Sequence, residues 1–401
     1  MTVSAGTRPV ATGRIAVLDG LRGCAILLVV ISHVRYGLSV AHPADKIVVH
    51  VMAMGWVGVD LFFVLSGFLV TGVLLDSRGG NGFYANFYRR RVLRIFPLYY
   101  CFLALVVSIA IVRRAESAEA RMLLANAGWY VTYLVNVLSL TAPLVTLPWG
   151  TGPLWTLAVE EHFYLVWPVI IAALRPRRLA IVCVLGALGA PVARALLLIA
   201  GNAGMLPTHV AETANYVLSP LRADSLLVGG LLAILHRGAH WRNTIRMARW
   251  SVVPLLVAVT SLALVTHGLS AVDHLVQVVG YSLLALIFVE MLALVLAYSD
   301  SESRAIVLLR SPALVSLGRY SYAIYLLHTP VLLLLDRGIP RQSLPRVHGM
   351  LWPGLLVYAV AFITWMWGIG WLSFNLFERQ FLDLRERYPY TRTATELLRP
   401  P

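Results

Sequence analysis

Long apolar runs separated by short polar and basic stretches form the dominant pattern of this chain. Eleven apolar segments can be delimited, near 18–38, 55–75, 92–112, 122–140, 153–174, 179–200, 216–235, 250–268, 275–298, 312–335 and 351–377. Helices of about 20 residues are long enough to cross the hydrocarbon core of a bilayer. The pattern therefore predicts an all-α, polytopic membrane helix bundle.

Arginine-rich clusters lie between the segments, at 89–94, 175–178, 237–249, 304–310 and 379–392. Cytoplasmic loops carry an excess of basic residues, so all these clusters are expected on the cytoplasmic side. Eleven full spans would place Arg175 outside, whereas ten spans bring every cluster inside. The segment 122–140 is the most polar one, and we expect it to be re-entrant or interfacial. The sequence thus predicts about ten spans with both termini cytoplasmic, at the cost of placing Arg113 and Arg114 outside.

Composition agrees with a membrane protein. Of the 401 residues 59% are hydrophobic and 13% are charged, about half the charged fraction of soluble domains. The net charge is +14, but the arginines lie between apolar runs, so nucleic acid is not an expected partner. The three cysteines lie inside apolar runs without metal-ligand spacing, and neither a metal nor a tightly bound cofactor is expected. We expect one membrane domain over 1–378 and a short basic cytoplasmic tail over 379–401.

Arg22 and His33 both lie in the first apolar segment. Ionisable groups at membrane depth are costly, so such a pair points to a functional site. Their separation is about three helical turns, which directs both side chains to nearly the same face, about 16 Å apart along the axis. One helix can thereby hold a fixed cation near one membrane surface and a titratable imidazole deeper in.

The second apolar segment contains Asp60 and the dipeptide Ser66–Gly67. The small residues serve either close helix packing or a site, and the absence of GxSxG leaves a serine nucleophile unsupported. Asp60 either caps the start of its helix or orients a catalytic partner.

Arg91 and Arg94 are three positions apart and share a helix face at the membrane entrance. They are either a positive-inside anchor or a pair of guanidiniums that grip phosphates bidentately.

Adjacent carboxylates, Glu160 and Glu161, interrupt a later apolar run. Charges there are rarely structural, and neighbours on a helix point about 100° apart, so at most one is expected to face a site squarely. His162 is either a ligand or an interfacial polar residue, and no metal-ligand set accompanies it.

Ser321, Tyr325 and His328 fall at i, i+4 and i+7 and form one helix stripe. A polar stripe within a span faces protein or a water-filled cavity. Interhelical hydrogen bonding and catalysis both explain it.

These segments, in this order, resemble the acyltransferase-3 family of integral membrane O-acyltransferases. The resemblance covers almost the whole chain and rests on Asp19–Gly23 running to His33, Phe62–Phe68, Arg91–Arg94, Trp155–Tyr164 and Gly318–His328. It implies transfer of an acyl group, usually acetyl, from acyl-CoA as co-substrate to a hydroxyl of a carbohydrate, lipid-linked, glycoside or macrolide acceptor.

The resemblance also implies residue roles. His33 and Arg22 match residues held to be essential, Arg91 and Arg94 match arginines associated with the acyl donor, and Arg319 replaces a lysine common at that place. The residues expected to support the site are Asp19, Ser66, Trp155, Tyr164, Ser321, Tyr325 and His328.

As a mechanism, we expect His33 to act as general base toward the acceptor hydroxyl. Glu161, Glu160 or Asp60 would orient its ring. An alternative is that His33 takes the acyl group covalently before passing it on.

Two other function classes compete with an enzyme. A proton-coupled exporter needs titratable groups strung across the membrane, which Arg22, His33, Asp60 and Glu161 could supply. A transporter should be indifferent to coenzyme A, and a structural scaffold should tolerate loss of all these residues.

Overall fold

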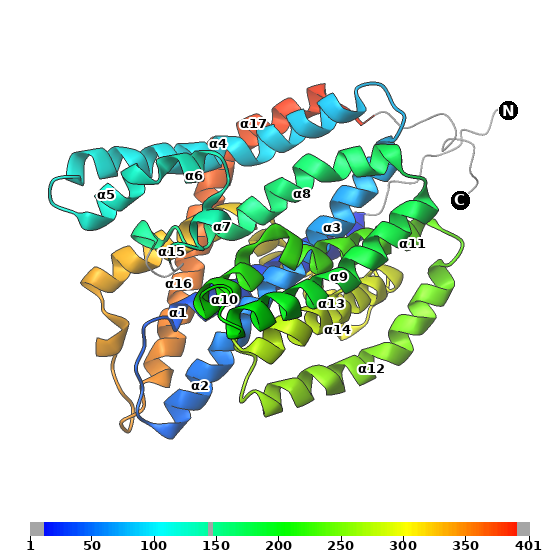
Figure 1. The fold of residues 1–401 in the computed structure, drawn as a ribbon. Coiled ribbons are helices and arrows are strands. Elements are labelled where there is room, and N and C mark those ends of the chain that lie inside the picture. The colour runs from blue at the N-terminus through cyan, green and yellow to red at the C-terminus, as the bar shows by residue number, and fades with distance from the viewer. Residues whose placement is uncertain (1–11, 143–146, 391–401) are drawn as a thin grey trace.

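The structure, a computed structural model, describes residues 12–142 and 147–390, and Figure 1 shows its arrangement as a bundle of helices. The longer helices are α1 (Thr12–Val34), α2 (Pro43–Ala53), α3 (Gly58–Ser77), α4 (Phe83–Arg113), α8 (Leu154–Ala173), α9 (Pro176–Asn202), α10 (Thr208–Val217), α11 (Ala223–Arg237), α12 (Trp241–Val265), α13 (Tyr281–Ala297), α15 (Pro312–Gly338) and α16 (Trp352–Ser373). The shorter ones are α5 (Ala118–Ala125), α6 (Ala127–Val131), α7 (Val135–Leu138), α14 (Arg304–Leu309) and α17 (Arg379–Leu384). The chain is 81% helical, and the described part contains no strand, which confirms the all-α prediction.

The helices confirm a multi-pass membrane protein. Within the described residues, eight helices are long and apolar enough to cross a bilayer, and the bent pair of α10 with Ser219–Arg237 makes up to nine. Helix α15 lies outside this set although its 27 residues are enough to span, because its polar stripe lowers its hydropathy. The segment 122–140 contains no spanning helix and is broken into the short helices α5, α6 and α7.

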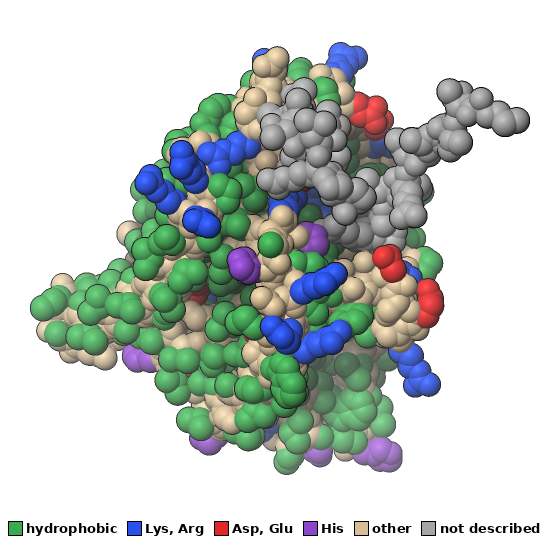
Figure 2. Space-filling model, turned by 90° about the vertical axis from the view of Figure 1, so that its right-hand side faces the viewer, with side chains coloured by type: hydrophobic (Ala, Val, Ile, Leu, Met, Phe, Trp, Pro, Cys, Tyr) green, Lys and Arg blue, Asp and Glu red, His purple; other side chains and the backbone are tan. Residues whose placement is uncertain are grey.

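Several basic clusters share one end of the bundle. The turns from α3 to α4, from α8 to α9 and from α11 to α12 all lie at the right of Figure 1. Figure 2 looks onto this end and shows Lys and Arg side chains gathered on it. Three of the basic clusters that the sequence separates are therefore collected at one end of the bundle.

Helix α9 shows how the bundle meets lipid. Large apolar side chains stand exposed along one of its faces at helical spacing: Ile181, Leu185, Leu188, Val192, Leu196 and Ile199. A continuous apolar stripe of this kind is unfavourable in water and favourable against acyl chains.

Glycines bring the central helices into close contact. A Cβ atom on Gly67 of α3 would overlap the carbonyl oxygen of Leu226 on α11, and one on Gly229 of α11 would overlap that of Val64 on α3. Small residues permit such backbone approach between membrane helices. The packing role that the sequence allowed for Gly67 is therefore the one that the structure shows.

Buried ion pairs link the start of α11 to α3 and to α9. The Asp60 carboxylate accepts hydrogen bonds from Arg222 (2.8 Å) and from the Ser225 hydroxyl (2.9 Å), and neither charged side chain is exposed. The Arg222 guanidinium also lies 3.9 Å from the centre of the Tyr281 ring. A second fully enclosed pair is formed by Arg194 and Asp224, at 2.9 Å. These pairs neutralise charges that would be costly in an apolar interior.

The glycine contact can be tested by adding one methyl group. We expect Gly67→Ala to lower the thermal unfolding midpoint of the purified protein in detergent, because overpacking of this kind costs about 1–3 kcal/mol. The matched control is Gly189→Ala on α9, where an added Cβ meets nothing within 4 Å. Equal midpoints for the two variants would refute the close α3–α11 approach.

The Asp60–Arg222 pair predicts a non-additive result. Asp60→Asn should destabilise the fold by about 3–5 kcal/mol, because it leaves the Arg222 charge buried and uncompensated. Adding Arg222→Gln should recover part of that loss, measured as unfolding midpoints in the same detergent. A double variant that is less stable than either single variant would show that the two residues are not a pair.

Candidate functional site

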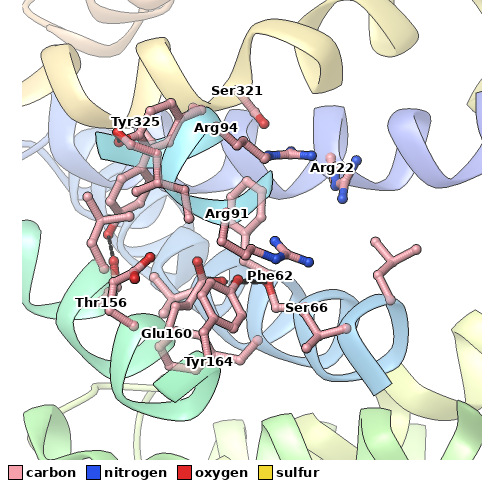
Figure 3. A pocket seen from close by; sticks show the side chains of 18 residues that line it. Arg22, Phe62, Ser66, Arg91, Arg94, Thr156, Glu160, Tyr164, Ser321 and Tyr325 are labelled. Atoms are coloured by element: carbon pink, nitrogen blue, oxygen red, sulfur yellow. Dashed lines mark hydrogen bonds between the residues drawn. The ribbon is translucent and has the colours of Figure 1, made fainter. Parts of the chain in front are cut away.

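A partly open cavity lies between five helices, with about 820 Å³ of empty space that includes the open solvent at its mouth. It collects predicted site residues that are up to 303 positions apart in the chain, as Figure 3 shows in close-up. They are Arg22 from α1, Ser66 from α3, Arg91 and Arg94 from α4, Glu160, Glu161 and Tyr164 from α8, and Ser321 and Tyr325 from α15.

Three arginines from two helices line the cavity. Arg22 is held by Asp19 at 3.0 Å, one turn earlier in α1. Arg91 lies 4.6 Å from the centre of the Tyr164 ring. Within the described ranges, the guanidiniums of Arg91 and Arg94 have neither a carboxylate partner within ion-pair distance nor a hydrogen-bond acceptor. Unpaired guanidiniums that face a cavity can bind an anion such as a phosphate bidentately.

Both glutamates of the adjacent pair line the cavity, although we expected at most one to face it. Glu160 accepts a hydrogen bond from the Ser66 hydroxyl on α3, at 2.6 Å. Glu161, the next residue along α8, feels the charge of Arg91 on α4. The cavity is lined by both α3 and α4, so neighbours about 100° apart on α8 can line it together.

The cavity extends to Tyr325, and two histidines lie beyond that residue. The Tyr325 hydroxyl accepts a hydrogen bond from Thr156 at 2.6 Å, and Phe62 packs edge-on against its ring. The ring centre of His328 lies 5.5 Å from that of Tyr325, and the ring centre of His33 lies 4.8 Å from that of His328. His33 itself does not line the cavity. The polar stripe of α15 connects His33 to the cavity.

The hydrogen bonds of His33 define its tautomer. Its Nδ1 lies 2.9 Å from the carbonyl oxygen of Val29, and a carbonyl can only accept, so Nδ1 carries the proton. The Nε2 atom of the neutral ring therefore holds the free lone pair that a base requires. Among the residues described, no carboxylate lies within ion-pair distance of the His33 ring, so the predicted carboxylate partner is replaced by a backbone carbonyl.

The remaining predicted residues lie outside the cavity. Asp60 is bound to Arg222 and Ser225, so its charge is neutralised within the core. Trp155 is buried and packs against Tyr216.

The two alternatives for His162 can now be compared. His162 Nδ1 lies 2.6 Å from the Ser219 hydroxyl, which fits the structural alternative better than a ligand. No group of three metal-ligating side chains occurs in the described part of the chain.

Three residues with clear structural roles were missed in the sequence: Arg194, which interrupts the apolar segment 179–200, and Arg222 and Asp224. Arg222 and Asp224 interrupt the apolar segment 216–235 as visibly as Glu160 interrupts its own. The rule that charges at membrane depth need a partner applies equally to them, and it would have identified the buried pairs.

Comparison with known proteins places the chain in a family. Residues 15–371 match a family model described as an acyltransferase domain. The chain is 27% identical over 378 residues to the peptidoglycan O-acetyltransferase OatA of Listeria monocytogenes, covering 90% of this chain and 54% of that protein. It is 24% identical over 350 residues to the O-acetyltransferase OatA of Staphylococcus aureus, covering 82% and 52%.

A further relative, an uncharacterized protein of Haemophilus influenzae, is 33% identical over 186 residues, which cover 44% of this chain and 74% of that protein. The chain spans about half the length of the two O-acetyltransferases that it matches. No solved structure matches the chain. The family model covers nearly the whole membrane bundle and every residue of the cavity, and the protein therefore belongs to the acyltransferase-3 family.

Proposed function

We propose that this protein is a membrane O-acyltransferase that moves an acetyl group from acetyl-CoA to a hydroxyl of a carbohydrate acceptor. The observation that carries the proposal is the cavity itself, with unpaired arginines on its wall and a histidine pair just beyond Tyr325. The names of the relatives, which are O-acetyltransferases, support the acetyl group and the hydroxyl acceptor.

The donor would bind through its phosphates. Among the described residues, Arg91 and Arg94 have no hydrogen-bonded or ion-pair partner, and they lie on one face of α4 with Arg22 beside them. A coenzyme A molecule held there would extend its thioester end along the cavity toward Tyr325. The thioester end would have to reach about 16 Å, the distance along α1 from Arg22 to His33 at about 1.5 Å per residue.

The transfer step can be written with its atoms balanced. The acceptor oxygen attacks the thioester carbonyl while His33 Nε2 takes the hydroxyl proton. The C–S bond then breaks, and the imidazolium returns the proton to the departing thiolate, giving an acetyl ester and free coenzyme A. In the alternative route, Nε2 attacks the thioester first and the C–S bond breaks, giving an acetylimidazolium and the coenzyme A thiolate. The acceptor oxygen then takes the acetyl group as the C–N bond breaks, and the hydroxyl proton passes to the thiolate.

The two ends of α1 suggest that donor and acceptor arrive from opposite sides. We assign the basic end of the bundle to the cytoplasm, because basic residues accumulate there. His33 lies at the other end of α1, so an acceptor could reach it from outside the cytoplasm. A cell-wall glycan, the acceptor named for one relative, fits this arrangement.

Binding of coenzyme A separates an acyltransferase from a transporter. We expect Arg91→Gln with Arg94→Gln to weaken coenzyme A binding at least tenfold, because a hydrogen bond to a charged group contributes about 1.5–3 kcal/mol. Isothermal titration of the protein in nanodiscs would measure this. The control Arg175→Gln with Arg178→Gln removes the same charge from exposed positions outside the cavity and should bind normally. Wild-type protein that does not bind coenzyme A would favour the transporter.

The role of His33 predicts a loss of turnover without loss of donor binding. His33→Ala should reduce acetyl transfer from radiolabelled acetyl-CoA to peptidoglycan glycan strands by about 10²–10⁴-fold. Its dissociation constant for coenzyme A should stay at the wild-type value, because His33 does not line the cavity. Wild-type turnover by a folded His33→Ala protein would exclude this histidine from the chemistry.

A further inference from the structure

We infer that Arg341 is a positioning residue for His33, and that together with Asp336 it forms a clamp joining the ends of α1 and α15. The inference rests on the proposed function, because it takes His33 as the catalytic base. Arg341 lies in the short turn Arg341–Ser343 that follows α15.

The side chain of Arg341 is almost fully buried, with 5% exposed. Its Nη1 donates to the carbonyl oxygens of Val34 (2.5 Å) and His33 (3.3 Å) at the end of α1. Its Nε and Nη2 donate to the two carboxylate oxygens of Asp336, at 2.9 and 3.1 Å. Asp336 also accepts a hydrogen bond from the backbone N–H of Arg341, at 3.0 Å. A single guanidinium thus connects three segments of chain.

The contact is made at the C-terminal end of α1, where the His33 carbonyl also accepts a hydrogen bond from the Tyr36 N–H at 2.9 Å. The last carbonyl groups of a helix have no intrahelical donor and carry partial negative charge. A basic side chain satisfies them, and one of the carbonyls that Arg341 binds belongs to His33 itself. The clamp therefore fixes the backbone from which the imidazole projects.

The other half of the clamp acts on His328. Asp336 lies in α15 about two helical turns after His328, so the clamp ties the two histidine-bearing helices together just beyond the histidine contact. The ring centres of His33 and His328 are 4.8 Å apart. A second connection runs in parallel, since the Gln342 side-chain amide donates to the Gly37 carbonyl at 3.2 Å.

An ordinary helix cap and a positioning clamp predict different kinetics. A cap would affect stability alone, whereas loss of the clamp displaces the base relative to the thioester. Displacement by about 1 Å can cost about 10²-fold in rate. The donor arginines Arg22, Arg91 and Arg94 line the cavity, whereas neither residue of the clamp does, so the KM for acetyl-CoA should not change.

The experiment uses the full chain in nanodiscs with acetyl-CoA and peptidoglycan glycan strands. We expect Arg341→Met to lower kcat about 10²-fold with an unchanged KM for acetyl-CoA. Arg341→Lys keeps the charge but loses the fork of donors, so it should fold and recover only part of kcat. The matched control is Arg346→Met, an exposed arginine of the same loop, which should behave as wild type.

A charge swap separates the carbonyl contacts from the ion pair. Asp336→Arg with Arg341→Asp keeps opposite charges together but places a carboxylate, which cannot donate, against the α1 carbonyls. It should not restore kcat. Restoration by the swap, or wild-type kcat in Arg341→Met, would overturn the inference.

A second readout is independent of the acceptor. Carbethoxylation of His33 by diethyl pyrocarbonate, followed by mass spectrometry, should become faster in Arg341→Met, because the last turn of α1 is no longer held, and stay unchanged in Arg346→Met. An unchanged rate in Arg341→Met would overturn the clamp. If His33→Ala retains transfer while this reactivity changes, the role of His33 as base fails and the clamp stands.

Discussion

The high cost of moving a charge out of water governs this structure. In an apolar interior a charged side chain either has a partner or borders an aqueous cavity. Two ion pairs are of the first kind, because all four side chains are enclosed and paired: Asp60 with Arg222, and Arg194 with Asp224. Arg91 and Arg94 are of the second kind, because they border the cavity.

Whether a charged side chain is paired or borders the cavity identifies the site better than its burial or its residue type does. Asp60 and Glu160 are both acids inside apolar helices, yet Asp60 is neutralised by an arginine, whereas Glu160 lines the cavity and is bound by a neutral serine. A charge that the protein leaves unneutralised is available to a ligand. Under the proposed function, the cationic end of the cavity is where an anionic donor would bind.

In the proposed mechanism, His33 is a base that has no carboxylate behind it. A carbonyl oxygen of the same helix fixes the proton on Nδ1 of His33, which leaves Nε2 as the acceptor. In a low-dielectric interior this arrangement avoids burying another charge. Orientation of the ring then depends on the backbone at the end of α1, where Arg341 and Asp336 hold it.

Much of the fold was accessible from the sequence because it depends on local properties. Apolar length predicts the spans, basic clusters predict the end at which they gather, and helical spacing predicts that Arg91 with Arg94, and Ser321 with Tyr325, share faces. Partners across helices are not encoded by spacing. The pairs Asp60–Arg222 and His33–His328 join residues 162 and 295 positions apart. The packing of glycine-lined helices sets the rotation and depth of each helix against its neighbours. Only this packing decided that Asp60 pairs with Arg222 in the core and that a backbone carbonyl orients His33.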